Sequence, residues 1–370
     1  MPDTLRVLML SKACVVGIYQ RKLEAIAAHG IELLALVPPS WKDERGETRL
    51  ERAYTAGYRL ETLPIRLNGN FHLHFYPGLA ARIRAFGPHV VHIDEEPYNL
   101  ATWQALRAAH EAGAKALFFT WQNLVRRYPP PFSWGERWTL RQADYALAGT
   151  ESAAAVLRAK GYAGPLRVIP QFGVDPALFR PADPAGDRPF TIGYIGRLVP
   201  EKGVHLLIQA AARLPGGWRL IVTGGGPLEA ELRALAARLG AAERVVFEGQ
   251  LPSAAMPARC AALDALALPS LTRPNWKEQF GRALVEAMAS GVPVVGSDSG
   301  AIPDVIGGAG LIVPEGDVEA LAGALARLQA DPALRADLAA RGRARALAHF
   351  THDQVAAATV QVYRELAAAL

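Results

Sequence analysis

The sequence has few of the features that mark a secreted or membrane-spanning protein. Its 370 residues contain only two cysteines, Cys14 and Cys260, whose wide separation argues against a disulfide framework. No window reaches the roughly 18 apolar residues that a membrane-spanning helix needs. The apolar run at residues 7–10 is too short for the core of a signal peptide. These absences predict a cytoplasmic protein that touches the inner membrane face at most peripherally.

Nucleic-acid motifs are absent as well. The sequence pI is 9.3, but no zinc-ligand spacing, helix-turn-helix pattern or RNA-binding aromatic motif accompanies it, so no nucleic-acid partner is expected. The net charge of +5 is unevenly divided, because residues 1–180 carry 22 basic and 16 acidic side chains whereas residues 181–370 carry 18 and 19. A basic first half favours an anionic acceptor or an anionic membrane surface, and an ordinary solvated surface is the alternative.

Short apolar runs alternate with segments of helical periodicity, which is typical of parallel strands joined by crossover helices. The alternation is interrupted at residues 176–189, where four prolines predict a linker, and resumes with an apolar strand at residues 190–195. The chain length also favours two domains. The sequence therefore predicts an α/β protein with two doubly wound parallel sheets, at residues 1–180 and 181–350. A helix at residues 351–370 is expected to pack back on the first domain.

Two glutamates in the second half, Glu278 and Glu286, are separated by seven residues, and Gly281 lies near the expected start of a helix. Helix N-termini attract anions, because their first amides are unpaired and the macrodipole adds positive potential. A loop glutamate, the amides near Phe280 and Gly281, and a helix glutamate together suit a sugar, a diphosphate and a ribose. This combination predicts a nucleotide-sugar site.

Two glycine-containing loops follow expected strands. Gly196 is followed by Arg197 and Lys202, and two cations beside a close-approach glycine suit a diphosphate leaving group. A turn with a solvated helix start is the alternative for this loop. The three glycines at residues 224–226 favour either backbone contact with a nucleotide at Gly225 or a tight strand-to-helix turn.

These motifs occur in one order along the second half. They comprise Gly196-Arg197, Lys202-Gly203, the triple glycine, residues 246–249, the spaced glutamates and residues 289–295. In this order they resemble the C-terminal half of the retaining glycosyltransferases of family 4, which have the GT-B fold of two Rossmann-like domains facing a central cleft. The resemblance covers residues 190–345 and is looser in the first half.

The resemblance implies metal-independent transfer of a hexose-type sugar, with retention, from a UDP- or GDP-linked donor to a glycan, lipid or small-molecule acceptor. The nucleotide sugar is then a co-substrate, and no cofactor is implied. Arg197 and Lys202 would hold the diphosphate, and Glu278 would contact the sugar hydroxyls. Further donor-binding positions are Gly17 and Leu284 near phosphate, Gly249 and Gln250 near the base, Phe280 and Gly281 near the sugar, and Glu286 at the ribose. Gly196 and Gly225 are the donor-binding positions where the backbone lets the ligand approach.

The acceptor side departs from the family pattern. Many relatives carry a histidine after the strand expected at residues 116–119, whereas this chain has Trp121, Gln122 and Asn123, none of which is a general base at neutral pH. These three residues are instead acceptor-side candidates for hydrogen bonding or for shaping the pocket. Two acids that follow another strand, Glu95 and Glu96, are candidates for orienting the acceptor, and an acidic surface loop is the alternative.

An arginine-rich and aromatic segment at residues 126–138 is interpreted as a loop that lines the acceptor cleft, touches a membrane interface or packs on its own domain. Two other functions stay open. The missing histidine suits a catalytically weak nucleotide-sugar-binding protein, and an inverting GT-B transferase or epimerase would share the fold.

Overall fold

The computed structural model describes residues 4–43, 46–182 and 188–370, so residues 183–187 of the predicted linker lie outside the described residues. The chain divides into two compact units. Unit 1 comprises Met1–Gly173 and His352–Leu370, and unit 2 comprises Val174–Thr351. The division therefore falls after residue 173, whereas proline density placed it after residue 180.

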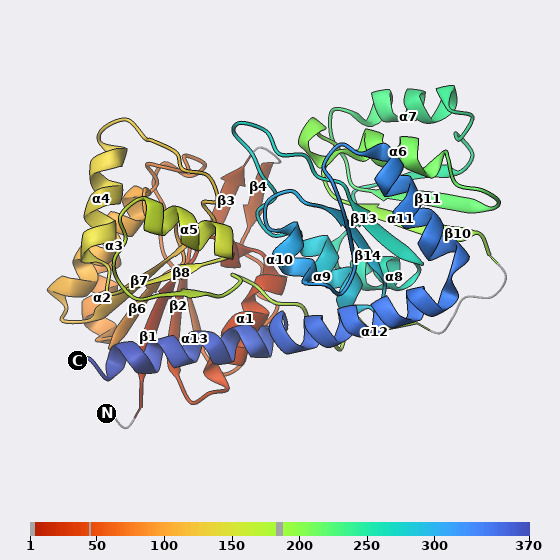
Figure 1. The fold of residues 1–370 in the computed structure, drawn as a ribbon. Helices are drawn as coiled ribbons and strands as arrows, with labels where there is room; N and C mark the ends of the chain where they lie inside the picture. Colours follow the sequence, from red (N-terminus) through yellow and green to blue (C-terminus); the bar gives the residue numbers. More distant parts are fainter. Residues whose placement is uncertain (1–3, 44–45, 183–187) are drawn as a thin grey trace. The chain divides into compact units, whose positions relative to one another are not determined.

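Within the described residues, unit 1 contains a seven-stranded parallel sheet in the order β5-β2-β1-β6-β7-β8-β9 (Figure 1). Its strands are β1 (Arg6–Leu10), β2 (Glu32–Val37), β5 (Arg59–Thr62), β6 (Val90–Ile93), β7 (Lys115–Thr120), β8 (Tyr145–Ala148) and β9 (Leu166–Val168). Its helices are η1 (Ala13–Val15), η2 (Gly17–Gln20), α1 (Arg21–Ala27), α2 (Leu79–Phe86), α3 (Leu100–Glu111), α4 (Phe132–Gln142), α5 (Glu151–Ala159) and α13 (His352–Ala367). A separate antiparallel pair is formed by β3 (Ser40–Asp43) and β4 (Gly46–Arg49).

Alternating side chains of β1 enter two different cores, as the two-residue period of a strand requires. Leu8 and Leu10 belong to the core that contains residues of α2, α3 and α5. Val7 and Met9 belong to the core that contains residues of α1 and α13. Helices therefore cover both faces of the sheet, which explains why its strands are almost continuously apolar.

Helix α13 belongs to unit 1 although it follows all of unit 2 in the sequence, and it lies beside α1 (Figure 1). It buries the four apolar positions that the sequence marks for burial, Val355, Val360, Val362 and Leu366. The hydroxyl of its Tyr363 also lies 2.6 Å from Nδ1 of His92 on β6.

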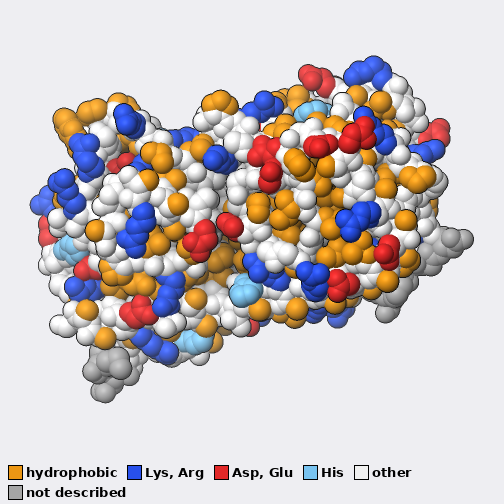
Figure 2. Space-filling view, viewed as in Figure 1, with side chains coloured by type: hydrophobic (Ala, Val, Ile, Leu, Met, Phe, Trp, Pro, Cys, Tyr) orange, Lys and Arg blue, Asp and Glu red, His pale blue; other side chains and the backbone are white. Residues whose placement is uncertain are grey.

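The segment expected to be a loop at residues 126–138 is only partly one, and this prediction is wrong from Phe132 onward, where α4 begins. Its prolines misled the prediction, because proline is also favoured at a helix start. Lys and Arg side chains gather over α4 and its preceding loop (Figure 2).

Within the described residues, unit 2 contains a six-stranded parallel sheet in the order β12-β11-β10-β13-β14-β15. Its strands are β10 (Phe190–Ile195), β11 (Trp218–Thr223), β12 (Val245–Gly249), β13 (Ala265–Leu268), β14 (Val294–Ser297) and β15 (Leu311–Val313). Its helices are η3 (Pro200–Lys202), α6 (Val204–Ala211), α7 (Glu229–Arg238), η4 (Ser253–Ala255), α8 (Met256–Ala261), α9 (Arg282–Ala289), α10 (Ile302–Ile306), α11 (Val318–Ala330) and α12 (Pro332–His349). The chain enters and leaves this unit side by side, because the amide of Val174 donates to the carbonyl of Phe350 at 2.8 Å.

Both sheets have the strand order that opens a crevice at their carboxyl edge. In unit 1 the first strand, β1, lies between β2 and β6, and in unit 2 the first strand, β10, lies between β11 and β13. The chain segments that follow β1 and β6, and those that follow β10 and β13, run to opposite sides of their sheet. The crevice between the carboxyl ends of such a strand pair is called the switch point, and ligands of open α/β sheets bind there. The predicted fold class of two doubly wound parallel sheets is confirmed. None of the described helices has the length and apolar character needed to cross a membrane.

Candidate functional site

The switch point of unit 2 brings together two of the predicted catalytic residues, Lys202 and Glu278. Nζ of Lys202, at the end of η3, lies 2.6 Å from Oε2 of Glu278, in the loop between β13 and α9. The hydroxyl of Ser270 donates to the same oxygen at 2.8 Å. The two side chains are only 15% and 7% exposed. This ion pair is therefore largely buried, and the hydroxyl of Ser270 helps to fix the Glu278 carboxylate.

A close backbone contact fixes the loop that carries Lys202. Gly203 has a φ of +65°, and a Cβ at this position would lie 2.0 Å from the carbonyl oxygen of Pro269. Only glycine tolerates both the left-handed conformation and this approach. The loops after β10 and β13 thus touch at Gly203, and this contact sets the distance between Lys202 and Glu278.

Arg197 lies in the same loop, and its guanidinium is 3.9 Å from the carboxylate of Glu201 with 44% of the side chain exposed. The preceding residue, Gly196, is covered by the triple glycine, because a Cβ on Gly224 would lie 1.9 Å from the Gly196 carbonyl oxygen. The tight-turn interpretation therefore explains Gly224. Gly225 is exposed with open space at its Cβ position, and its contact with a nucleotide stays a prediction.

Helix α9 places Glu286 in its second turn, and this carboxyl is only 6% exposed. Burial raises its pKa, and the guanidinium of Arg282, which donates to Oε1 at 2.7 Å, opposes that shift. The expected contact between the Leu284 amide and phosphate stays a prediction, and this amide already has a partner within the chain. That amide donates to the carbonyl of Gly281 at 2.8 Å, and the Leu284 side chain is buried.

The other predicted donor positions also follow strands of the second sheet. Phe280 is half-buried against the core, and its ring meets Phe350 edge to face at 5.8 Å between centroids. Gly249 ends β12 and accepts a hydrogen bond from the Gly224 amide at 2.8 Å, while Gln250 is exposed. All of these positions share the carboxyl edge with Lys202.

Several hydroxyl groups at this edge were not predicted. Ser270, Thr272 and Ser299 follow β13 and β14, and the hydroxyls of Thr272 and Ser299 lie 3.1 Å apart. Thr272 also bonds to Glu315, which follows β15. Serine and threonine are common in turns, so their type carries little signal. Their positions just after strands of a parallel sheet are the signal that would have found them.

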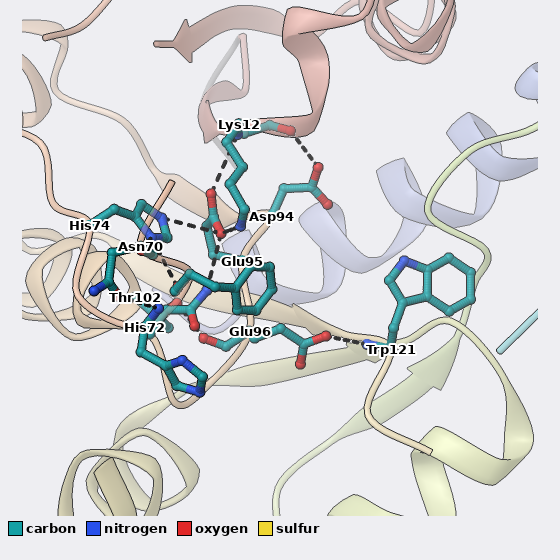
Figure 3. A network of polar contacts seen from close by, with 12 residues as sticks. Lys12, Asn70, His72, His74, Asp94, Glu95, Glu96, Thr102 and Trp121 are labelled. Atoms are coloured by element: carbon teal, nitrogen blue, oxygen red, sulfur yellow. Dashed lines mark hydrogen bonds and ion pairs between the residues drawn. The ribbon is translucent and has the colours of Figure 1, made fainter. Parts of the chain in front are cut away.

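The switch point of unit 1 carries a second pair of a lysine and a glutamate (Figure 3). Nζ of Lys12, after β1, bonds to Oε2 of Glu95, after β6, and the amide of Asn99 donates to the same oxygen at 3.3 Å. Glu95 and Glu96 are only 2% and 8% exposed. The alternative of an acidic surface loop is therefore wrong. Lys12 was missed by the sequence analysis, because no glycine motif surrounds it.

His74 faces Glu95 without a hydrogen-bond donor between them. Its Nδ1 lies 3.1 Å and 3.0 Å from the carbonyl oxygens of Asn70 and Phe71, so Nδ1 carries the proton. Burial lowers the pKa of His74 to about 3, and the ring is neutral at pH 7. Its Nε2 is thus an acceptor, 3.6 Å from Oε2 of Glu95. Among the described residues, neither this atom nor Oδ1 of Asn99 has a hydrogen-bond partner.

Lys12 lies between charged and aromatic groups. Burial lowers the pKa of Lys12 to about 8, against the opposing effects of the Glu96 and Asp94 carboxylates. Its ammonium lies 5.3 Å from the ring centroid of Trp41 and 4.7 Å from that of Phe71. The side chain is 12% exposed.

The side chain of Glu96 accepts hydrogen bonds from residues at the end of β7. This is the place where many relatives carry the histidine that this chain lacks. Oε2 accepts from the Thr120 hydroxyl at 2.6 Å, and Oε1 accepts from the Trp121 amide at 2.8 Å (Figure 3). Burial raises the pKa of Glu96, and these hydrogen bonds oppose the shift. Each carboxylate oxygen already accepts one hydrogen bond from the protein, so Glu96 positions the loop after β7, and its contact with an acceptor stays a prediction.

The three residues at the place of the missing histidine are mostly enclosed by the protein, and two of them have side-chain hydrogen bonds within unit 1. The indole of Trp121 donates to Gln171 at 2.7 Å. The side chain of Gln122 donates to the Tyr128 hydroxyl at 3.1 Å and accepts from Lys160 at 2.9 Å. Asn123 is 9% exposed.

The predicted approach of Gly17 to phosphate stays a prediction. Its amide donates to Oε2 of Glu51 at 2.7 Å, so this amide already has a partner within the chain. Apart from Gly17, the donor-side candidates lie in unit 2 and the acceptor-side candidates lie in unit 1. No group of three or more His, Cys, Asp or Glu side chains arranged to hold a metal ion occurs in the part of the chain that the structure describes.

Two family models match consecutive parts of the chain, "Glycosyltransferase Family 4" at residues 21–178 and "Glycosyl transferases group 1" at residues 178–345. The chain belongs to glycosyltransferase family 4. A 2-deoxystreptamine glucosyltransferase of Streptomyces kanamyceticus is 36% identical over 54% of this family 4 chain and 54% of that protein. A GDP-mannose-dependent alpha-(1-6)-phosphatidylinositol monomannoside mannosyltransferase of Mycolicibacterium smegmatis is 38% identical over 47% and 48%. The chain thus matches about half the length of these curated relatives.

The fold of the chain is shared with a solved sucrose-phosphate synthase from Thermosynechococcus elongatus. The TM-score is 0.75 at 24% sequence identity, and the match covers 99% of this chain and 100% of that one. At this identity the likeness establishes the fold.

Proposed function

We propose that this protein transfers a hexose-type sugar from a UDP- or GDP-linked donor to an acceptor hydroxyl, with retention of anomeric configuration. The observation that carries the proposal is the buried pair of Lys202 and Glu278 at the switch point of the second sheet. This pair places a cation that can bind a diphosphate next to a carboxylate that can accept hydrogen bonds from sugar hydroxyls. The loop that carries Lys202 also carries Arg197.

In the proposed reaction the acceptor oxygen bonds to the anomeric carbon as the bond from that carbon to the diphosphate oxygen breaks. The acceptor proton leaves with the nucleoside diphosphate or to solvent. Negative charge grows on the departing phosphate, so Lys202 and Arg197 interact more strongly with the transition state than with the ground state. These two cations provide charge neutralisation without a metal ion, and we propose that none is required.

Glu286 is proposed to accept hydrogen bonds from the two ribose hydroxyls. A carboxylate only accepts hydrogen bonds, and it has two oxygens for two neighbouring donors. Burial disfavours the charged form of Glu286, because it removes the water that would donate hydrogen bonds to the carboxylate. The ribose hydroxyls would replace those donors. Gly225, Gly249, Gln250, Phe280 and Gly281 remain proposed contacts to the rest of the donor.

The names of the relatives support a hexose and leave the base open, since one is a glucosyltransferase and the other depends on GDP-mannose. Their acceptors differ in the same way, one name containing an aminocyclitol and the other a glycolipid. For this chain we propose a glycan, lipid or small-molecule acceptor at the Lys12 and Glu95 network of unit 1. The basic first half supports peripheral contact with a membrane at its cytoplasmic face.

The absence of a histidine after β7 favours one other candidate, a protein that binds nucleotide sugars with little catalysis. Trp121, Gln122 and Asn123 occupy that loop, and none of them is a general base at neutral pH.

A thermal-shift screen against a panel of nucleotide sugars identifies the donor, because a ligand that binds the native state raises the melting temperature. Transfer from that donor to a panel of acceptors is then followed by NMR of the anomeric proton. A product with the donor's configuration supports the proposal, and the opposite configuration supports an inverting enzyme. Donor binding with neither transfer nor hydrolysis would establish the weakly catalytic alternative.

A further inference from the structure

We propose that the acceptor is an amphiphile, whose hydroxyl-bearing head is bound at Lys12, Glu95 and His74 and whose apolar part lies on the exposed surface of residues 67–73 and 125–134. The proposal rests on the proposed transferase function and names its acceptor class.

The polar network contains more acceptors than donors. Nε2 of His74 and Oδ1 of Asn99 lie in fully buried side chains and, within the described residues, have no hydrogen-bond partner. Oε2 of Glu95 lies 3.6 Å from Nε2 of His74 and 3.3 Å from the side-chain nitrogen of Asn99. Unsatisfied buried acceptors are costly, and an O–H donor would relieve them. A hydroxyl also accepts from the Lys12 ammonium, so a polyol head supplies both roles that the network requires.

Phe71 joins this network to the exterior. Its ring centroid lies 4.7 Å from Nζ of Lys12, while 41% of the residue is exposed. Its carbonyl accepts from Nδ1 of His74, so the same residue fixes the histidine that faces Glu95. A molecule that reaches Lys12 along this side chain therefore meets an aromatic surface before it meets the charges.

The apolar surface continues from Phe71 along two segments. Among the described residues of unit 1, five of the six exposed large hydrophobic side chains lie within them, at Leu67, Phe71, Leu73, Val125 and Trp134. Leu67 also has a φ of +54°, which is unusual for a bulky residue. Clustered apolar exposure beside a polar site marks a binding surface.

The two segments form one surface because an aromatic stack joins them. The ring of His72 lies 5.6 Å from that of Tyr128 and 5.1 Å from that of Phe132. Tyr98 lies 4.6 Å from Tyr128 and 6.3 Å from Phe71, which closes the stack on the side of β6. A continuous path thus leads from Lys12 across Phe71 to residues 125–134, and this continuity favours one occupant with a polar and an apolar end.

The test compares acceptors that share one sugar head. Methyl and octyl glycosides are assayed below the concentration at which octyl glycosides form micelles, with the donor found by the thermal-shift screen. The octyl chain adds apolar area to be removed from water, so its KM should be at least about 10-fold lower than that of the methyl glycoside.

Variants locate this preference on the proposed surface. Phe71→Ala should bring the ratio of the two KM values to within about 3-fold of unity, because it removes apolar contact area. Leu73→Ala should narrow the ratio in the same direction, and it provides a second test if Phe71→Ala does not fold. The matched control is Leu239→Ala in unit 2, which changes an equally exposed leucine (42%) and should leave the ratio unchanged. Lys12→Met should lower kcat/KM for both glycosides equally.

Equal KM values for the two glycosides in the unaltered protein would overturn the proposal, even if it transfers sugar to both. So would a ratio that Phe71→Ala and Leu73→Ala change no more than Leu239→Ala does. Binding to vesicles of anionic phospholipid without a preference for octyl glycosides would assign the surface to a membrane and also overturn it. Failure of the proposed function is a separate result, namely no transfer to any glycoside together with no donor hydrolysis.

Discussion

Replacing Lys202 by methionine tests the donor site most directly. The substitution keeps most of the side-chain volume but removes an ammonium 2.6 Å from the Glu278 carboxylate, in a place where the two side chains are 15% and 7% exposed. A hydrogen bond to a charged group contributes about 1.5–3 kcal/mol, and this one is too buried for solvent to screen it strongly. We therefore expect Lys202→Met to lower the free energy of unfolding by about 2 kcal/mol.

The same change should lower turnover by roughly 100-fold or more, as the loss of one preorganised charge donor commonly does. Stability and catalysis are separated by a double-mutant cycle with Glu278→Gln. The double variant leaves no unpaired buried charge, so part of the lost stability should return, with a coupling of about 1–3 kcal/mol. Turnover should not return, because the diphosphate and the sugar have each lost a partner.

Urea unfolding measures the stabilities, and initial rates at saturating donor measure turnover. The control is Arg188→Met, which breaks the pair of Arg188 and Asp264 (2.7 Å) at the amino ends of β10 and β13, the same two strands whose carboxyl ends carry the site. It should leave turnover within about 2-fold of normal. Near-normal turnover in Lys202→Met would refute the diphosphate role. Recovery of turnover in the double variant, in parallel with stability, would show that the pair is only structural.

Three further substitutions test other parts of the structure. Gly203→Ala should lower the free energy of unfolding by at least about 2 kcal/mol more than Gly240→Ala in urea unfolding, because both glycines have a φ of +65° but only Gly203 has backbone within the reach of a Cβ. Burial raises the pKa of Glu286, so the folded state binds more protons than the unfolded state and the ionised carboxyl weakens stability as pH rises above its unfolded pKa. Between pH 4 and pH 7 the unfolding free energy of Glu286→Gln should therefore increase relative to that of the unaltered protein. A difference between the two that does not change with pH would contradict this. Tyr363→Phe should cost about 1–2 kcal/mol in the same assay, since it leaves Nδ1 of buried His92 without its partner at 2.6 Å, and an unchanged stability would show that this bond contributes nothing.

The sequence was sufficient for the fold class and for most of the donor loops, for identifiable reasons. Hydrophobic periodicity reports which face of an element is buried, so the parallel strands and the buried positions of α13 could be predicted. Glu278 and Lys202 could be selected because each lies in a motif with glycine at a strand or helix end. Their direct contact could not be predicted, because it depends on the order of strands within the sheet, which no local pattern specifies.

The same limit explains what the sequence analysis missed in unit 1. Lys12 meets Glu95 only because β1 and β6 are neighbours, although 83 residues separate them. The amide of Gly17 is taken by Glu51, which comes from a distant loop, and composition near Gly17 gives no sign of it. The error at α4 has a local origin instead, since prolines precede helices as well as occur in loops.

The membership of α13 in unit 1 has a consequence for how the chain is made. All of unit 2 has been synthesised once residue 351 is reached, and its two ends are already paired through Val174 and Phe350. Most of unit 1 is synthesised before unit 2. Its apolar face beside α1 is covered only after residues 352–370 have been made, because Val355 and Tyr363 belong to that segment. On the ribosome, unit 2 is therefore the first unit that can complete its fold, and the apolar face of unit 1 beside α1 needs protection until residues 352–370 have been made.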